Sequence, residues 1–168
     1  KVLLSLLTVA SFSTSILACK LSHSYPEVLP DIKITALIVS PSKNSVAVLD
    51  TATNRVTQTL ATDEKPSSIA VNSSKSLILV TNTNSNTVSA FLRRDTDTFV
   101  KLNSIGTGIR PIGITFNPNP NFSEAYVVCE GDGKNGELMI LAHKEKNSAP
   151  IITRVLPLPN TSPKKIAV

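Results

Sequence analysis

Three short segments share one pattern, in which a proline is followed three residues later by isoleucine, then by a small residue and an apolar one. They read Pro66-Ser-Ser-Ile-Ala-Val71, Pro111-Ile-Gly-Ile-Thr-Phe116 and Pro163-Lys-Lys-Ile-Ala-Val168, spaced 45 and 52 residues apart. A motif that recurs at such intervals is typical of proteins built from tandem structural repeats. The sequence therefore predicts that one small unit is copied along the chain.

The segments between these prolines also recur in a constant order, and each favours a β-strand. Second strands are expected at residues 37–39, 77–80 and 125–128, third strands at 45–50, 87–91 and 137–141, and last strands at 55–60, 99–102 and 151–156. Four strands in about 45 residues match one blade of a β-propeller. We therefore expect an all-β fold, a partial propeller of about three four-stranded antiparallel blades at residues 32–65, 66–110 and 111–162, with 163–168 starting another.

The composition supports a β-rich class and excludes several others. Hydrophobic residues make up 41% of the 168 residues and charged residues only 17%, which disfavours a disordered chain. The formal charge of +5 is dispersed, and no basic stripe is interleaved with aromatic residues, which supply only 4% of the chain. We therefore expect no nucleic-acid partner.

The strand and turn sequences resemble the YVTN-type β-propeller repeat. The resemblance is carried by Val80-Thr-Asn82, Asn86-Thr-Val-Ser89, Val48-Leu-Asp-Thr-Ala-Thr-Asn54 and Pro66-Ser-Ser-Ile-Ala-Val71, and it spans about Ile32 to Val168. The third repeat departs from it through longer loops at 130–136 and 144–150. The WD40 repeat is disfavoured because the chain has no tryptophan. Surface-layer and lactonase-like members of the family usually close a ring of seven blades, so the resemblance implies that this chain is a fragment.

The N-terminal residues are typical of a secretory signal peptide. Lys1 precedes an apolar run from Val2 to Leu17, which is shorter than the roughly 20 residues that a membrane-spanning helix needs. We therefore assign residues 1–19 to a signal segment and residues 20–31, which contain two prolines, to a linker. The mature protein is expected outside the cytoplasm, in the periplasm, on the cell surface or secreted.

Ile16-Leu-Ala-Cys19 resembles the bacterial lipobox, in which the cysteine becomes an acylated N-terminus. Lipidation of Cys19 and ordinary cleavage after Ala18 both remain open. If the protein contacts a membrane, we expect it to do so only through a lipid anchor at Cys19. The other cysteine, Cys129, lies in an apolar strand, which predicts a buried inert thiol. The cysteines and histidines lack metal-ligand spacing, so we expect no metal and no cofactor.

The candidate ligand face combines two sets of loops, because in a four-stranded blade the turns between second and third strands and the connections between blades emerge at the same end. The first set contains Ser42, Lys43, Asn44, Asn82, Asn84, Glu130, Asp132 and Lys134, and the second contains Asp63, Lys65, Thr107, Arg110, Asn160 and Lys164. Lys65, Arg110, Asn82, Asn84, Glu130 and Asp132 are the principal candidates. The glycine-rich loop 130–136 has a cation-binding and a plain turn interpretation, and the turn is favoured.

No catalytic residues are expected, because the sequence has no nucleophile elbow, no paired histidine and serine and no HExxH motif. The leading hypothesis is a non-catalytic scaffold that binds an unknown protein, polysaccharide or small ligand. One alternative is a lactonase-like hydrolase, which the segment from Phe91 to Gly106 resembles. Another is the propeller domain of a larger extracytoplasmic redox or surface-layer protein.

Overall fold

The computed structural model describes residues 35–94, 98–144 and 147–167, all within one compact unit, Ile34–Val168. The signal segment, the linker and Cys19 lie outside the described residues. Within these ranges the chain consists of β-strands and one short 3₁₀ turn, η1 (Pro41–Lys43), with no α-helix. None of the described segments is a helix that could cross a membrane.

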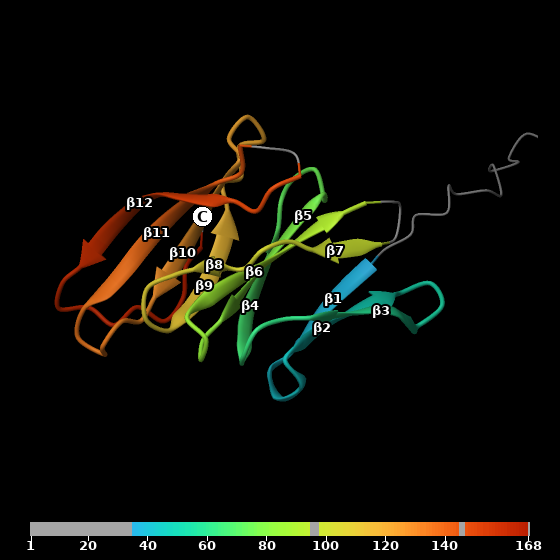
Figure 1. Ribbon diagram of the computed structural model, residues 1–168, viewed down its shortest axis with the longest axis horizontal. Coiled ribbons are helices and arrows are strands. Elements are labelled where there is room, and N and C mark those ends of the chain that lie inside the picture. Colours follow the sequence, from blue (N-terminus) through green and yellow to red (C-terminus); the bar gives the residue numbers. More distant parts are fainter. Residues whose placement is uncertain (1–34, 95–97, 145–146, 168) are drawn as a thin grey trace, which may run out of the picture. The chain divides into compact units, whose positions relative to one another are not determined.

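The strands form three antiparallel sheets, one for each predicted blade (Figure 1). The first blade contains β1 (Thr35–Ser40), β2 (Ser45–Asp50) and β3 (Arg55–Ala61). The second contains β4 (Pro66–Val71), β5 (Leu77–Asn82), β6 (Thr87–Arg93), β7 (Phe99–Lys101) and β8 (Ile105–Gly106). The third contains β9 (Pro111–Phe116), β10 (Glu124–Cys129), β11 (Gly136–Ala142) and β12 (Ile151–Leu158). The predicted all-β partial propeller is confirmed.

Tight turns connect the strands of the hairpins. Three of these turns end in an asparagine whose backbone is in the left-handed conformation. Asn44, Asn54 and Asn86 have φ values of 49°, 55° and 54°, a conformation that asparagine tolerates better than most residues. In the β2–β3 turn the Asp50 carboxylate accepts the backbone N–H groups of Ala52 and Thr53 at 2.9 and 3.2 Å. These turns set the register that directs alternate side chains to opposite faces.

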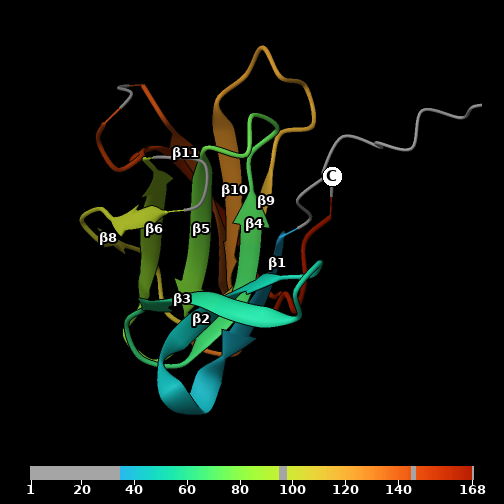
Figure 2. The same cartoon turned by 90° about the vertical axis from the view of Figure 1, so that its right-hand side faces the viewer.

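The second blade is packed on both sides, with the third blade against one face and the first blade against the other (Figures 1 and 2). All six residues of β5 are buried. Leu77 and Leu79 join a core with side chains of the third blade, and Ile78 and Val80 join a separate core with the first. Residues of one strand thus alternate between two cores, as period-two side-chain geometry requires.

The strands farthest from these cores are largely exposed. Every residue of β12 except Leu158 is exposed, and β3 buries only Leu60. Large apolar side chains are therefore left at the surface, among them Val56 at 55% and Ile151 at 51% exposure. Burial is consequently concentrated in the middle of the three-blade unit.

Two predicted strands differ from the structure. The last strand of the second blade, expected at 99–102, is divided into β7 and β8, which pair with different parts of β6. Residues 163–167, expected to begin a strand, have no strand partner among the described residues, although Ile166 packs beside Gly113 of β9. A strand requires a hydrogen-bonded neighbour, which a propensity motif alone does not provide.

We predict that Leu79→Ala lowers the free energy of unfolding by about 2 to 5 kcal/mol, because it opens a cavity in the core between the second and third blades. The matched control Leu156→Ala removes the same atoms from a side chain that is 39% exposed, and should cost less than about 1 kcal/mol. Urea unfolding measures both values. Equal losses would contradict the two-core packing.

Candidate functional site

Both predicted loop sets meet at one end of the blades, which we call the loop face. Thr83, in the β5–β6 turn, donates its backbone N–H to the Lys65 carbonyl at 2.9 Å. In the third blade Glu130 donates its N–H in the same way to the Arg110 carbonyl, also at 2.9 Å. The structure thus places inter-blade connections directly against the hairpin turns, as the blade geometry predicts.

An asparagine immediately before the third strand of each blade holds these loops together. The Asn44 side-chain oxygen accepts the N–H of Lys65 at 2.9 Å, and that of Asn86 accepts the N–H of Arg110 at 2.8 Å. Asn135 makes the same contact with Asn160 at 3.3 Å. We call Asn44, Asn86 and Asn135 the latch asparagines. The sequence contains this signal, an asparagine preceding each third strand, but the repeat comparison did not identify it.

The residues held by the latches share an unusual backbone. Lys65, Arg110 and Asn160 have φ values between 55° and 57°, in the left-handed region that non-glycine residues seldom occupy. The side-chain acceptor satisfies an N–H that this bend directs away from the strands. The backbone N–H groups of Lys65 and Arg110 therefore hold the inter-blade connections to the hairpin turns, whatever their side chains contact.

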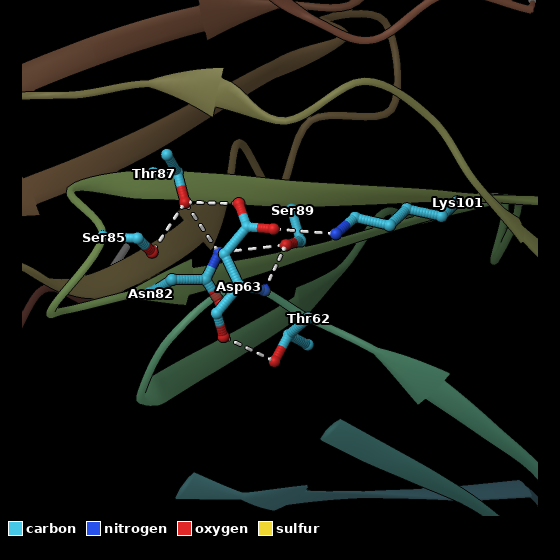
Figure 3. Close-up of polar contacts among 7 residues, drawn as sticks. All are labelled: Thr62, Asp63, Asn82, Ser85, Thr87, Ser89 and Lys101. Atoms are coloured by element: carbon cyan, nitrogen blue, oxygen red, sulfur yellow. Dashed lines mark hydrogen bonds and ion pairs between the residues drawn. The ribbon is translucent and has the colours of Figure 1, made fainter. Parts of the chain in front are cut away.

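Asn82 is buried instead of lying on the surface, and it belongs to a polar network that extends to the partly exposed Asp63 and Lys101 (Figure 3). Its amide nitrogen donates to the hydroxyls of Thr87 at 3.1 Å and Ser89 at 2.9 Å. Thr87 in turn donates to the Asp63 carboxylate at 2.7 Å, and Lys101 donates to the other Asp63 oxygen at 2.8 Å. The sequence predicts Asn82 for the ligand face. In the structure it instead links strands β5 and β6, and through Thr87 it is connected to Asp63 between the first and second blades.

The same network lowers the pKa of Asp63. Burial acts to raise the pKa of Asp63, but side-chain hydrogen bonds from Lys101, Thr87 and Ser104 outweigh it and leave the pKa below its usual value of 3.8. The charged form is therefore the one that the fold stabilises. At neutral pH this carboxylate is an ionised structural anchor.

Glu130 and Arg110, both predicted for the ligand face, form an ion pair with each other. Arg110 Nη2 lies 2.9 Å from Glu130 Oε2, and Lys164 contacts the other carboxylate oxygen. Ser162 donates a further hydrogen bond to the same oxygen at 3.3 Å. The Glu130 side chain is only 10% exposed, whereas that of Arg110 is 59% exposed. The Arg110 guanidinium beside the third blade is therefore paired with a carboxylate.

Asp132 stabilises its own loop. One carboxylate oxygen accepts the backbone N–H groups of Asn135 and Lys134 at 2.7 and 2.8 Å, and these bonds lower the pKa of Asp132. Gly131 and Gly133 have φ values of 74° and 91°, which the turn requires. Among the residues that the structure describes, no group of three or more His, Cys, Asp or Glu side chains could hold a metal ion. The arrangement fits the turn interpretation.

Of the six principal candidates for the ligand face, Lys65 and Asn84 line an open cavity, together with Ser42 and Asn44 of the first predicted loop set. A cavity of about 320 Å³, which we call the loop hollow, lies at the loop face; its lining residues are Pro41, Ser42, Asn44, Glu64, Lys65 and Asn84. Asn84 donates its backbone N–H to the Glu64 carbonyl at 3.3 Å, which holds the β5–β6 turn against the connection between the first and second blades. The lining residues of the hollow include a serine, two asparagines, a lysine and a glutamate.

Cys129 is free and buried, as predicted for an inert thiol. Burial, and secondarily the charge of Glu137, raise the pKa of Cys129 to about 11. The thiol therefore remains protonated at neutral pH, and its sulfur packs against Met139.

No protein-family model and no curated protein matches this sequence. Solved structures do resemble the fold. Hydrazine synthase of Kuenenia stuttgartiensis is 24% identical with a TM-score of 0.65, over 78% of this chain and 34% of that one. A candidate 6-phosphogluconolactonase from Bacteroides fragilis is 18% identical with a TM-score of 0.66, over 78% of this chain and 37% of that one. Another from Bacteroides uniformis is 15% identical with a TM-score of 0.64, over 75% and 38%.

These likenesses show the fold, a β-propeller-type arrangement of blades. The chain covers just over a third of each of these structures. The activities named for the three proteins belong to chains that are much longer than the part matched.

We predict that Asp63→Asn destabilises the protein at pH 7 and that its effect shrinks as the pH falls below about 4. A carboxylate with a lowered folded pKa stabilises the fold above its unfolded pKa, and that stability is lost as the pH falls through the folded value. Urea unfolding between pH 7 and 3 measures the difference. The control Glu64→Gln changes an exposed neighbouring carboxylate, and its free energy of unfolding should differ from that of the wild type by the same small amount at every pH. If Asp63→Asn lowered the free energy of unfolding by the same amount at every pH, the ionised Asp63 carboxylate would not be what stabilises the fold.

Proposed function

We propose that this protein is an extracytoplasmic YVTN-type propeller scaffold that binds a polyhydroxylated ligand, such as a polysaccharide, without catalysing a reaction on it. The observation that carries the proposal is a difference between two groups of residues at the loop face. Asp63, Glu130 and Asp132 are each engaged by hydrogen bonds or ion pairs within the fold, while Lys65 and Asn84 face the loop hollow.

The chemistry of the loop hollow favours a sugar over a strongly charged ligand. Lys65 and Glu64 contribute opposite charges, and Ser42 and Asn84 contribute neutral donors and acceptors. Sugar hydroxyls both donate and accept hydrogen bonds, so they match such a mixed surface. The surrounding blades provide a rigid support for these loop residues.

The extracytoplasmic part of the proposal rests on residues 1–19. Their apolar run after Lys1 supports export, and the lipobox-like Ile16–Cys19 supports attachment to a membrane through a lipid on Cys19. A scaffold exposed outside the cytoplasm would meet surface polysaccharides directly.

A lactonase-like hydrolase is the second candidate function. It is supported by the likeness of the fold to the two candidate 6-phosphogluconolactonases and by the resemblance of residues 91–106. A third is a propeller domain within a larger protein, supported by the likeness to about a third of hydrazine synthase. The hydrolase requires a reaction centre at the loop face, whereas the scaffold and the propeller domain of a larger redox or surface-layer protein require only a binding surface.

We predict that Lys65→Gln reduces binding to immobilised polysaccharides roughly tenfold, because a charged hydrogen-bond donor is lost from the loop hollow. The matched control is Lys75→Gln, since Lys75 has nearly the same φ, 56° against 55°, in the exposed β4–β5 turn. Bound protein is measured on an array of neutral, uronic and amino-sugar polysaccharides. Wild-type protein that binds none of them, or equal effects of the two variants, would defeat the proposal.

A lactone hydrolysis assay separates the scaffold from the hydrolase. The proposal expects no turnover of gluconolactone or 6-phosphogluconolactone above the spontaneous rate. Turnover that Arg110→Gln abolishes, with unfolding by urea otherwise unchanged, would establish the hydrolase instead.

A further inference from the structure

The latch asparagine of the third blade, Asn135, differs from the other two in the residue that follows it. The other two precede a serine and a threonine, whereas Asn135 precedes Gly136, and this is the single asparagine–glycine pair in the sequence. An asparagine side-chain carbonyl carbon lies within reach of the backbone nitrogen of the next residue. A side chain on that next residue hinders their approach, and glycine has none. The pair is therefore the one best suited to close a ring.

The packing of the third blade requires the glycine. Gly136 is buried at the first position of β11, beside Cys129 and Pro163. A Cβ atom at this position would lie 2.9 Å from the Cys129 carbonyl oxygen and would overlap the Pro163 ring, which real Cβ atoms essentially never do. The latch uses an asparagine at 135 and the packing excludes a side chain at 136. The fold thus places the reactive pair here.

The Asn135 side chain is exposed and held less tightly than those of the other latches. Its oxygen lies 3.3 Å from the Asn160 nitrogen, against 2.9 and 2.8 Å in the first and second latches, and its amide nitrogen lies 3.4 Å from Asp132 Oδ2. Such long hydrogen bonds are weak. The Gly136 N–H donates to the Thr161 carbonyl at 2.9 Å, so local opening must free it before it reacts.

We propose that Asn135 is a site of spontaneous covalent modification by deamidation, whichever ligand the loop face binds. The backbone nitrogen of Gly136 attacks Asn135 Cγ, so that a C–N bond forms and the bond from Cγ to Nδ2 breaks. Ammonia leaves with the proton of the Gly136 nitrogen, and a cyclic succinimide remains. Water then adds to either ring carbonyl and opens the ring to aspartate or isoaspartate. Solvent water is the only co-reactant, and nothing is oxidised or reduced.

Either product weakens the third latch. Aspartate at 135 places a second carboxylate beside Asp132, where the Asn135 amide had donated a hydrogen bond, and the like charges repel. Isoaspartate adds one carbon atom to the backbone, which disrupts the bridge between residue 135 and Thr161. The modification is therefore expected to loosen residues 160–164 from the third blade.

Ageing of the purified full chain in mildly alkaline buffer tests the reaction. Samples are digested with pepsin at acidic pH, and the peptides are separated by chromatography and identified by mass spectrometry. We expect the peptide that contains Asn135 to change from amide to acid, in two isomeric forms. Peptides that contain Asn44 and Asn86 are controls within the same sample and should keep their amides. An unchanged Asn135, or equal conversion of all three asparagines, would overturn the proposal.

Hydrogen exchange on the same samples tests the effect on the latch. Amides of residues 160–164 should exchange roughly tenfold faster in the modified chain, the loss expected for one hydrogen bond. The control Asn135→Ser keeps an acceptor oxygen but cannot cyclise, so ageing should leave its exchange unchanged. The ageing test uses the wild-type chain and does not depend on how this variant folds. Unchanged exchange after conversion, or equal acceleration in aged Asn135→Ser, would contradict opening of the latch by the modification.

Discussion

Strand β5 is buried along its whole length because its two faces belong to two different cores. Leu77 and Leu79 pack toward the third blade, and Ile78 and Val80 pack toward the first. Each such side chain contributes about 1.5 to 3 kcal/mol when it is fully buried. The flanking blades are therefore stabilised by one shared strand, and burial decreases from it toward β3 and β12.

The same strand ends in two buried polar residues, which connect the cores to the loop face. Thr81 exchanges hydrogen bonds with Ser68 across the sheet, and Asn82 binds the hydroxyls of Thr87 and Ser89. Ser67 extends this connection to the carbonyl of Pro111 at 3.3 Å, where the third blade begins. Asn82 is therefore buried in the fold, whereas Lys65 and Asn84 line the loop hollow at the surface.

Much of the fold could be predicted from the sequence, because the apolar runs and proline motifs recur with the period of the blades. The strands at 45–50, 66–71 and 111–116 have the predicted bounds. The candidate site was less predictable, because residue type and loop position do not show which side chains pair with each other. Arg110 and Glu130 are twenty residues apart in sequence, and only the folded blades bring their charges to 2.9 Å.

The packing of one blade against the next could not be predicted for the same reason. Sequence repeats predict each blade, whereas the position of one blade against the next follows from core side chains such as Leu79 and Leu141.

Hydrogen exchange followed by mass spectrometry tests this packing most directly, because it compares the local stability of each strand in one sample. If β5 is shared between two cores, amides of Leu77–Asn82 should exchange only through global unfolding, whereas those of Ile151–Leu158 should exchange much faster. Equal protection of β5 and β12, or faster exchange in β5, would contradict the account.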